Sequence, residues 1–269
     1  MLIRRRLLLL LLLALLLVAT VGGPLFLSSP VGTALSRQRA LALQHALHHK
    51  DSCSPKKPFA VIVTAIRPSL RLPSRYEAVS IANKRQYCCR QGCDLIVVRS
   101  QNSSSANPAW AKIEELQRQF AKYEWIWVID LDAYIMNKSI GFEEIVGVHG
   151  TNREIIIAQD YPAFVVNAGS FFVHSSPYTI RFVEEWFRHH QERIHLFEQA
   201  VFASLFTRNY MDIQDRTALV PLRTINSYCP EHLIPDFRYQ PGDFVVHFPG
   251  QCKGRQHEFV NRHFDSIIR

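Results

Sequence analysis

The sequence predicts an α/β domain, with a Rossmann-like and mostly parallel sheet flanked by helices, that follows an N-terminal transmembrane anchor. Two observations support this class. Short apolar runs alternate with helical stretches through the middle of the chain, and an uncharged, leucine-rich run stands near its start. The chain has 269 residues, of which 48% are apolar and 20% charged, as is typical of one globular domain with a sizeable core.

The N-terminal run is expected to anchor the protein in a membrane. Residues 7–27 carry no charge and match the roughly 20 residues that span a bilayer. Three arginines precede the run, which predicts a cytoplasmic tail over residues 1–6 and a translocated remainder. A cleaved signal peptide is the alternative, because residues 7–18 are the most apolar part and small residues follow them. We favour the uncleaved anchor, since residues 24–27 extend the span.

Either interpretation places the rest of the chain in an oxidising lumen, with residues 28–57 as a stem and residues 58–269 as the folded domain. Two glycosylation sequons begin at Asn102 and Asn137. Removing the three N-terminal arginines from the net charge of +8 leaves +5, with no long basic run, so a nucleic-acid partner is not expected. Six cysteines could form up to three disulfides, namely Cys53, Cys88, Cys89, Cys93, Cys229 and Cys252.

Strands and helices alternate from residue 59 onward. The run 59–66 is short, apolar and rich in β-branched residues, which is typical of a buried strand. A βαβαβ order follows and implies a parallel sheet, whose right-handed crossovers bring the strand ends, and the ligand, to one edge. In order, strands are expected at 59–66, 94–98, 125–130, 154–158, 165–173 and 243–248, and helices at about 75–91, 109–122, 177–192 and 195–206.

The third expected strand ends in Asp130-Leu131-Asp132. Residues i and i+2 of an extended segment point the same way, so both carboxylates can face one cation. Hard oxygen ligands suit Mg²⁺ or Mn²⁺, which commonly share their coordination shell with substrate phosphates. A nucleotide diphosphate is a poor leaving group until its developing charge is neutralised. An aspartate can also simply end a strand, but the position after a series of parallel strands favours the metal site.

Further segments match one known family in order along the chain, over roughly residues 75–255. The matching blocks are Asn83–Cys88, Trp110–Lys112, Tyr123–Asn137, Asp160 with Asn167–Phe171, Glu198–Gln199 and Gly242–Phe248. Together they resemble glycosyltransferase family 34, which contains retaining fungal Golgi α-galactosyltransferases and α-mannosyltransferases and plant xyloglucan α-xylosyltransferases. Several blocks in the right order are far more specific than the two aspartates alone.

The resemblance implies a GT-A-like fold with Mn²⁺ or Mg²⁺ bound by Asp130, Asp132 and His247. Lys253 would lie near the diphosphate of the donor, as would Asp130. Neutral imidazole is a good third ligand for Mn²⁺, and a lysine supplies a point charge to phosphate. Considered alone, His247 could equally be an ordinary strand-end histidine, and Lys253 a solvated surface charge.

The same resemblance implies that Asn167, Gly169 and the Glu198–Gln199 pair line the donor-sugar and acceptor side. Gly169 would permit close backbone approach to a ligand. Glu198 or Gln199 would act at the anomeric carbon, either as a stabiliser of oxocarbenium character or as a weak nucleophile. In the alternative interpretation, Gly169 marks a bulge and the Glu198–Gln199 pair is only the polar start of a helix.

Two departures from the family pattern are visible. The family usually has Arg-Asn after the strand that carries Gly169, where this chain has His174-Ser175. An extra Gln251 lengthens the terminal block before Lys253. The insertion moves Lys253 one position further from His247 than the lysine of the family pattern. The missing arginine removes a side chain that could select the donor or the acceptor.

By resemblance, the expected function is retaining, Mn²⁺-dependent transfer of galactose, mannose or xylose from a UDP- or GDP-sugar to a glycan hydroxyl. The protein would be a single-pass type II protein of the Golgi membrane, with a luminal catalytic domain and with other Golgi glycosyltransferases as candidate partners. The alternatives are an inactive glycosyltransferase-fold subunit of a Golgi complex and a metal-dependent nucleotide-sugar hydrolase. The intact set of Asp130, Asp132 and His247 favours an enzyme over the inactive subunit.

Overall fold

The computed structural model describes residues 37–44, 46, 58–65, 75–99, 108–160, 165–192 and 197–268. The predicted anchor at 7–27 and the sequon at Asn102 lie outside these residues. Among the described residues, no helix combines the length and apolar character that a membrane crossing requires. The chain divides into two compact units, 1–41 and 42–269, and the second contains both sheets described below. The anchor, the stem and their boundaries stay predictions.

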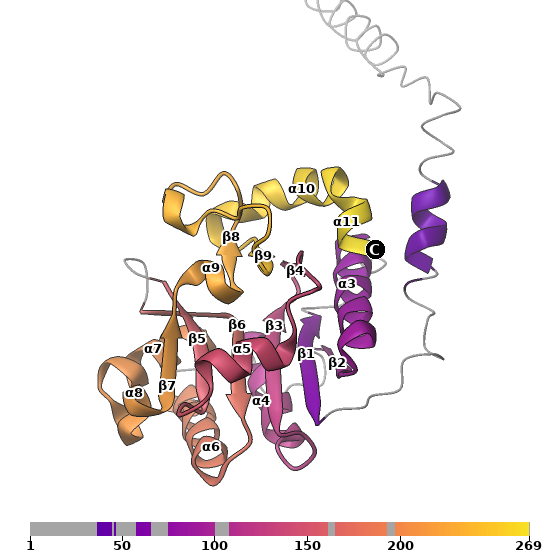
Figure 1. Cartoon of the computed structure of the whole chain (residues 1–269). Coiled ribbons are helices and arrows are strands. Elements are labelled where there is room, and N and C mark those ends of the chain that lie inside the picture. The colour runs from indigo at the N-terminus through magenta and orange to yellow at the C-terminus, as the bar shows by residue number, and fades with distance from the viewer. Residues whose placement is uncertain are drawn as a thin grey trace, which may run out of the picture. The chain divides into compact units, whose positions relative to one another are not determined.

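A six-stranded sheet forms the centre of the folded domain (Figure 1). Strand β1 pairs in parallel with β2 and β3, as the βαβαβ order predicts. Strand β6 runs antiparallel to both β3 and β5, whereas β5 and β7 are parallel. The strands, in spatial order, are β2 (Asp94–Arg99), β1 (Phe59–Ala65), β3 (Trp125–Asp130), β6 (Val166–His174), β5 (Ile155–Gln159) and β7 (Thr217–Val220).

The reversal at β6 follows from the length of its connection. Only residues 160–165 separate β5 from β6, whereas a parallel crossover needs a dozen residues or more. The two neighbouring strands therefore pair as a hairpin, and the sheet is mixed rather than uniformly parallel.

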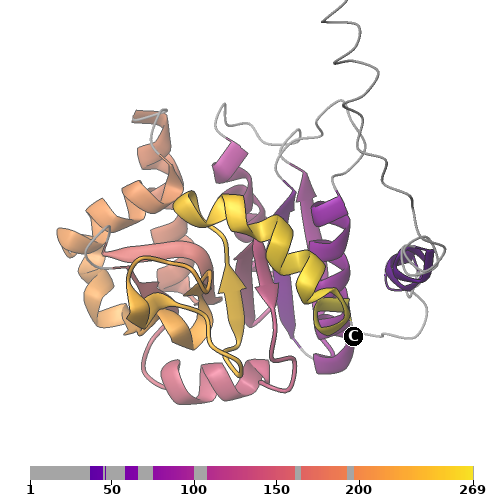
Figure 2. The same ribbon diagram turned by 90° about the horizontal axis from the view of Figure 1, so that it is seen from above.

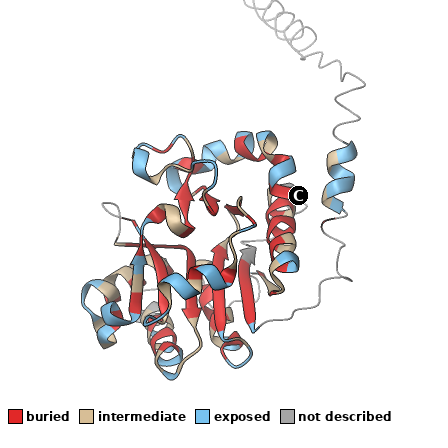
Figure 3. Cartoon of the chain, viewed as in Figure 1, coloured by how far each residue is buried: buried red, intermediate tan, exposed pale blue. Residues whose placement is uncertain are grey.

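Helices cover both faces of the sheet, and its inner strands β3, β6 and β5 are almost entirely buried, unlike the edge strands β2 and β7 (Figures 2 and 3). Along β3, Trp125, Trp127 and Ile129 join the core on the face of α3, while Ile126 and Val128 join the core beneath α4, α6 and α7. Burial on both faces explains why β3 is an unbroken apolar run. The longer helices are α3 (Arg75–Gln91), α4 (Ala111–Gln119), α5 (Phe142–His149), α6 (Pro177–Glu192) and α7 (Glu198–Thr207).

The remaining helices are short. Helices α8 (Ile213–Arg216) and α9 (Leu222–Ile225) flank β7 in the sequence. Helices α10 (Gln256–Arg262) and α11 (Phe264–Ile268) lie beside α3 in both views (Figures 1 and 2). Single 3₁₀ turns occur at Pro108–Trp110, Tyr210–Asp212 and Pro235–Phe237, and a longer one at Gly250–Arg255.

A second, three-stranded sheet corrects one expectation. The segment 243–248 was expected to join the main sheet, but its strand β9 (Val245–His247) lies between β4 (Ala133–Ile135) and β8 (Ser227–Tyr228). Strand β4 starts immediately after Asp132 and pairs antiparallel with β9. His247 therefore reaches the aspartates through this small ladder and not along the edge of the main sheet.

The cysteines form fewer disulfides than their number allows. Cys229 and Cys252 are bonded, which joins the end of β8 to the segment after β9. Cys89 is also disulfide-bonded. Cys88 and Cys93 are free and buried, so they serve as small apolar side chains in the core.

Candidate active site

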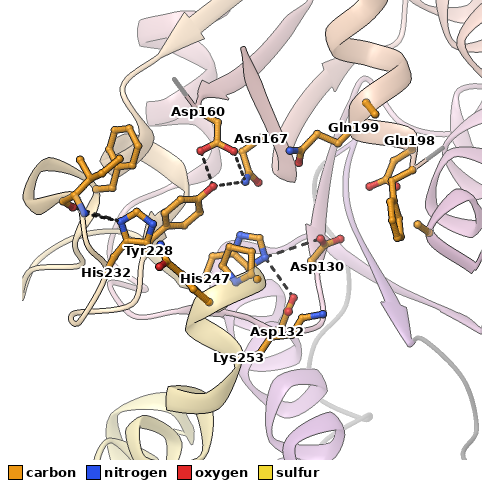
Figure 4. A pocket seen from close by; sticks show the side chains of 18 of the residues that line it. Asp130, Asp132, Asp160, Asn167, Glu198, Gln199, Tyr228, His232, His247 and Lys253 are labelled. Carbon is orange, nitrogen blue, oxygen red and sulfur yellow. Dashed lines mark hydrogen bonds and ion pairs between the residues drawn. The ribbon is translucent and has the colours of Figure 1, made fainter. Parts of the chain in front are cut away.

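Three side chains predicted to bind a metal ion lie together above the main sheet (Figure 4). The Nε2 atom of His247 lies 3.3 Å from Oδ1 of Asp132 and 4.0 Å from Oδ2 of Asp130. One ligand atom from each residue lies within 4.8 Å of the others. Two carboxylate oxygens and one imidazole nitrogen at this spacing fit Mn²⁺ or Mg²⁺, which leave further positions for substrate oxygens.

The β4–β9 ladder fixes two of these residues relative to each other. Ala133 lies directly opposite His247 in the ladder. The backbone N–H of Phe248 donates to the carbonyl of Asp132 at 3.0 Å. Asp130 comes from a different element, the end of β3. The cluster therefore depends on the junction between the two sheets.

Gly169 in β6 contacts the ring of His247. A Cβ atom on residue 169 would lie 2.2 Å from Cε1 and 2.7 Å from Nδ1 of that ring. Only glycine leaves this space for the imidazole, and the expected approach of the donor sugar to Gly169 stays a prediction. The Nδ1 atom of His247 is buried and has no hydrogen-bond partner among the described residues.

Lys112 in α4 is a site residue to which sequence reasoning gave no role. Its Nζ lies 2.7 Å from Oδ1 of Asp130 and 2.8 Å from Oε1 of Glu198, and it also donates to the carbonyl of Ala168. The side chain is 3% exposed. Burial lowers its pKa, but the two carboxylates outweigh burial, so the pKa of Lys112 is raised. A charged residue on the buried face of an otherwise amphipathic helix was the available signal.

The predicted catalytic pair begins helix α7. Glu198 is buried, and its Oε2 atom has no partner among the described residues. Burial raises the pKa of Glu198, although Lys112 opposes this. Gln199 accepts a hydrogen bond at Oε1 from the backbone N–H of Ala168 at 3.0 Å. Both side chains line the cavity described below.

Asn167 has no free hydrogen-bonding capacity. Its amide donates to Asp160 at 3.3 Å and to Tyr228 at 2.6 Å. Its carbonyl oxygen accepts from the Gly169 backbone at 2.8 Å and from Asn226 at 2.7 Å. Since an asparagine side chain offers two donors and two acceptor sites, all four are used. Asn167 also lines the cavity, so it supports its neighbours there, and its contact with the donor sugar stays a prediction.

Asp160 and Tyr228 complete this network. The hydroxyl of Tyr228 donates to Oδ1 of Asp160 at 2.7 Å (Figure 4). Asp160 is 3% exposed and lines the cavity. Burial raises its pKa, although the hydrogen bonds from Tyr228 and Asn167 oppose this. Asp160 stands in a segment that matches the family but had no predicted role, and Tyr228 stands in no pattern that could have identified it.

A cavity of about 670 Å³ opens over the metal-ligand cluster. This is the size of typical small-molecule sites, which are roughly 300–1,000 Å³. Lys253 is exposed and lines the cavity despite the additional Gln251 before it. Burial raises the pKa of Asp132, but His247 and Lys253 outweigh it, so the pKa of Asp132 is lowered. The cavity also has apolar walls, which include Phe197, Leu233, Ile234 and Phe237.

The chain is similar in sequence to known proteins. The family described as galactosyl transferase GMA12/MNN10 matches residues 56–147 and 146–258. A probable α-1,6-mannosyltransferase of Saccharomyces cerevisiae is 28% identical over 225 residues, which cover 66% of this chain and 56% of that protein. An α-1,2-galactosyltransferase of Schizosaccharomyces pombe is 27% identical over 240 residues, covering 74% and 58%. The chain thus spans little more than half the length of these relatives.

A solved structure supports the fold. The glycosyltransferase involved in glycosylation of the major capsid of PBCV-1 superposes with a TM-score of 0.58. The two chains are 13% identical, and the match covers 76% of this chain and 98% of that one. At this identity the likeness concerns the fold alone, and it confirms the predicted GT-A-like α/β architecture.

Proposed function

Because the chain belongs to the galactosyl transferase GMA12/MNN10 family, we propose that it is a metal-dependent glycosyltransferase. It moves galactose, mannose or xylose from a UDP- or GDP-sugar to a hydroxyl of a glycan, with retention of anomeric configuration. The observation that carries the proposal is the cluster of Asp130, Asp132 and His247 at the floor of a ligand-sized cavity.

The charge of the leaving diphosphate explains why a metal-binding cluster is needed. A bound Mn²⁺ or Mg²⁺ would neutralise the negative charge that develops on the departing diphosphate. Asp130, Asp132 and His247 would hold this cation through their two carboxylates and the Nε2 atom. Lys253 is exposed at the cavity wall, where its ammonium group would bind a phosphate oxygen.

Glu198 and Gln199 would act on the sugar side. Lys112 is shared by Asp130 and Glu198, so the lysine couples the cation site to the predicted catalytic pair. An ionised Glu198 beside the anomeric carbon would stabilise positive charge in an oxocarbenium-like transition state. Its ion pair with Lys112 lowers its nucleophilicity, which favours same-face attack over a covalent intermediate. Gln199, with Oε1 already bonded, would offer its NH₂ group to a substrate hydroxyl.

The Golgi lumen is the proposed location of the catalytic domain. The Cys229–Cys252 disulfide supports an oxidising compartment. A cytoplasmic tail at 1–6, an anchor at 7–27 and a stem at 28–57 would give a single-pass type II topology. Association with other Golgi glycosyltransferases stays a prediction.

A donor panel tests the proposed activity. The full chain is incubated with UDP- and GDP-sugars, oligosaccharide acceptors and Mn²⁺, with a metal-free arm containing a chelator. Metal-dependent formation of an α-linked product is expected with one donor. Release of free sugar without transfer would instead indicate a hydrolase, and absence of both products would indicate an inactive subunit.

A further inference from the structure

Helix α3 contacts the turn that carries the two aspartates. The hydroxyl of Ser80 donates to the carbonyl of Leu131, which lies between them. The ammonium group of Lys84 donates to the same hydroxyl at 2.7 Å and to the carbonyl of Ala133 at 2.5 Å. Ser80 and Lys84 are both fully buried. One helix therefore holds the backbone carbonyls on either side of Asp132.

A third residue of α3 also binds the backbone of this segment. Asn83 accepts from the backbone N–H of Ile135 and donates to its carbonyl, each at 2.8 Å. Residues 131, 133 and 135, which span a turn and the strand β4, thus all present backbone groups to α3. The intervening carbonyl of Asp132 points the other way and accepts from Phe248, next to His247. The backbone of Asp132 is fixed between α3 and β9.

The choice of a lysine at position 84 needs an explanation beyond packing. Burying an ammonium group is costly unless it is compensated. Burial lowers the pKa of Lys84 to about 7, and the charged groups that oppose this are Asp132 and Asp130. The hydrogen bonds to Ser80 and to the carbonyl of Ala133 compensate its burial in part, and the second joins it to the residue after Asp132.

We propose that Ser80, Asn83 and Lys84 are positioning residues of the metal site, which fix the separation of the Asp130 and Asp132 carboxylates before a cation binds. This inference rests on the proposed function, because it requires that the cluster binds Mn²⁺. A purely structural role for α3 predicts a loss of stability alone. A positioning role predicts weaker metal binding in a protein that is still folded, as is found when groups that orient metal ligands are removed.

Ser80→Ala tests the inference, because it removes the hydrogen bond to the carbonyl of Leu131 without changing the charge of the protein. Its matched control is Thr179→Val at the start of α6, where another fully buried hydroxyl donates to a backbone carbonyl, that of His174. Binding of Mn²⁺ alone to the full chain is measured from the paramagnetic resonance signal of the free ion, and folding is measured by circular dichroism. Ser80→Ala is expected to bind Mn²⁺ about tenfold more weakly than wild type, and Thr179→Val to bind it equally.

The possible results distinguish the positioning role of α3 from the metal site itself. Equal affinity in wild type and folded Ser80→Ala would overturn the positioning role while leaving the metal site intact. A wild type that does not bind Mn²⁺ would overturn the proposed metal site and this inference with it. Should Ser80→Ala not fold, Ser80→Cys replaces it, since a thiol is a weaker donor of similar shape, and the same weakening is expected.

Discussion

Gly169 lies so close to His247 that a methyl group at residue 169 would overlap the imidazole, with 2.2 Å between the new Cβ and Cε1. Gly169→Ala is therefore expected to displace the ring and weaken Mn²⁺ binding by about tenfold or more. Gly147→Ala is the control, because a Cβ atom there has no neighbour within 4 Å. Mn²⁺ affinity is measured for both variants. Unchanged affinity in Gly169→Ala would mean that His247 does not bind the ion in the position described.

Lys112→Met should destabilise the domain strongly. The substitution leaves Asp130 and Glu198 without the cation that each contacts. Removing one partner from a buried ion pair costs about 3–5 kcal/mol, because the remaining charge stays buried. The free energy of unfolding is measured in urea, with exposed Lys122→Met as a control that should change it by less than about 0.5 kcal/mol. Similar values for the two variants would show that Lys112 is not needed for charge balance.

Asp160→Asn should change how stability depends on pH. Burial raises the pKa of the Asp160 carboxyl in the folded protein. Its contribution to stability is therefore fully present below its unfolded pKa of about 4 and is lost as pH rises through the higher folded value. As pH rises above about 4, wild type should lose stability relative to Asp160→Asn. Urea titrations across this range test the slope, and parallel curves would contradict the account.

Removal of the Cys229–Cys252 disulfide should lower the free energy of unfolding by about 3 kcal/mol. The two cysteines are 23 residues apart, and a cross-link of this length restricts the unfolded chain by roughly that amount. The Cys229→Ser/Cys252→Ser variant is compared with wild type by urea unfolding. Equal free energies of unfolding would mean that the disulfide contributes little to the stability of the folded domain.

The main sheet was largely predictable because most of its strands are short apolar runs, although the edge strand β7 was not among the expected ones. The helices at 75–91 and 177–192 were predicted with the observed bounds, and β3 likewise. The second sheet was not predictable in the same way. Its strands have two or three residues each, too few for a periodic pattern, and the pairing of Ala133 with His247 joins residues more than a hundred positions apart.

Parts of the candidate site were predictable and parts were not, because some roles depend on contacts between distant segments. Asp130, Asp132 and His247 stand in blocks that match a family, and the fold brings them together. Lys112 lies in a matching block too, and its place on the buried face of α4 was a signal, but its two carboxylate partners come from distant segments that no local pattern reveals. Asn167 shows the converse: its block matched, yet its four hydrogen bonds are all made within the protein.

The Mn²⁺ dependence of sugar transfer by wild type and His247→Ala tests the central claim most directly. His247 lies 3.3 Å from Asp132 at the junction of the two sheets and is proposed as the third ligand. Transfer is measured over a Mn²⁺ titration with the donor identified by the panel. The account predicts that His247→Ala needs at least about tenfold more Mn²⁺ for half-maximal transfer. Superimposable curves would remove His247 from the metal site and contradict the account.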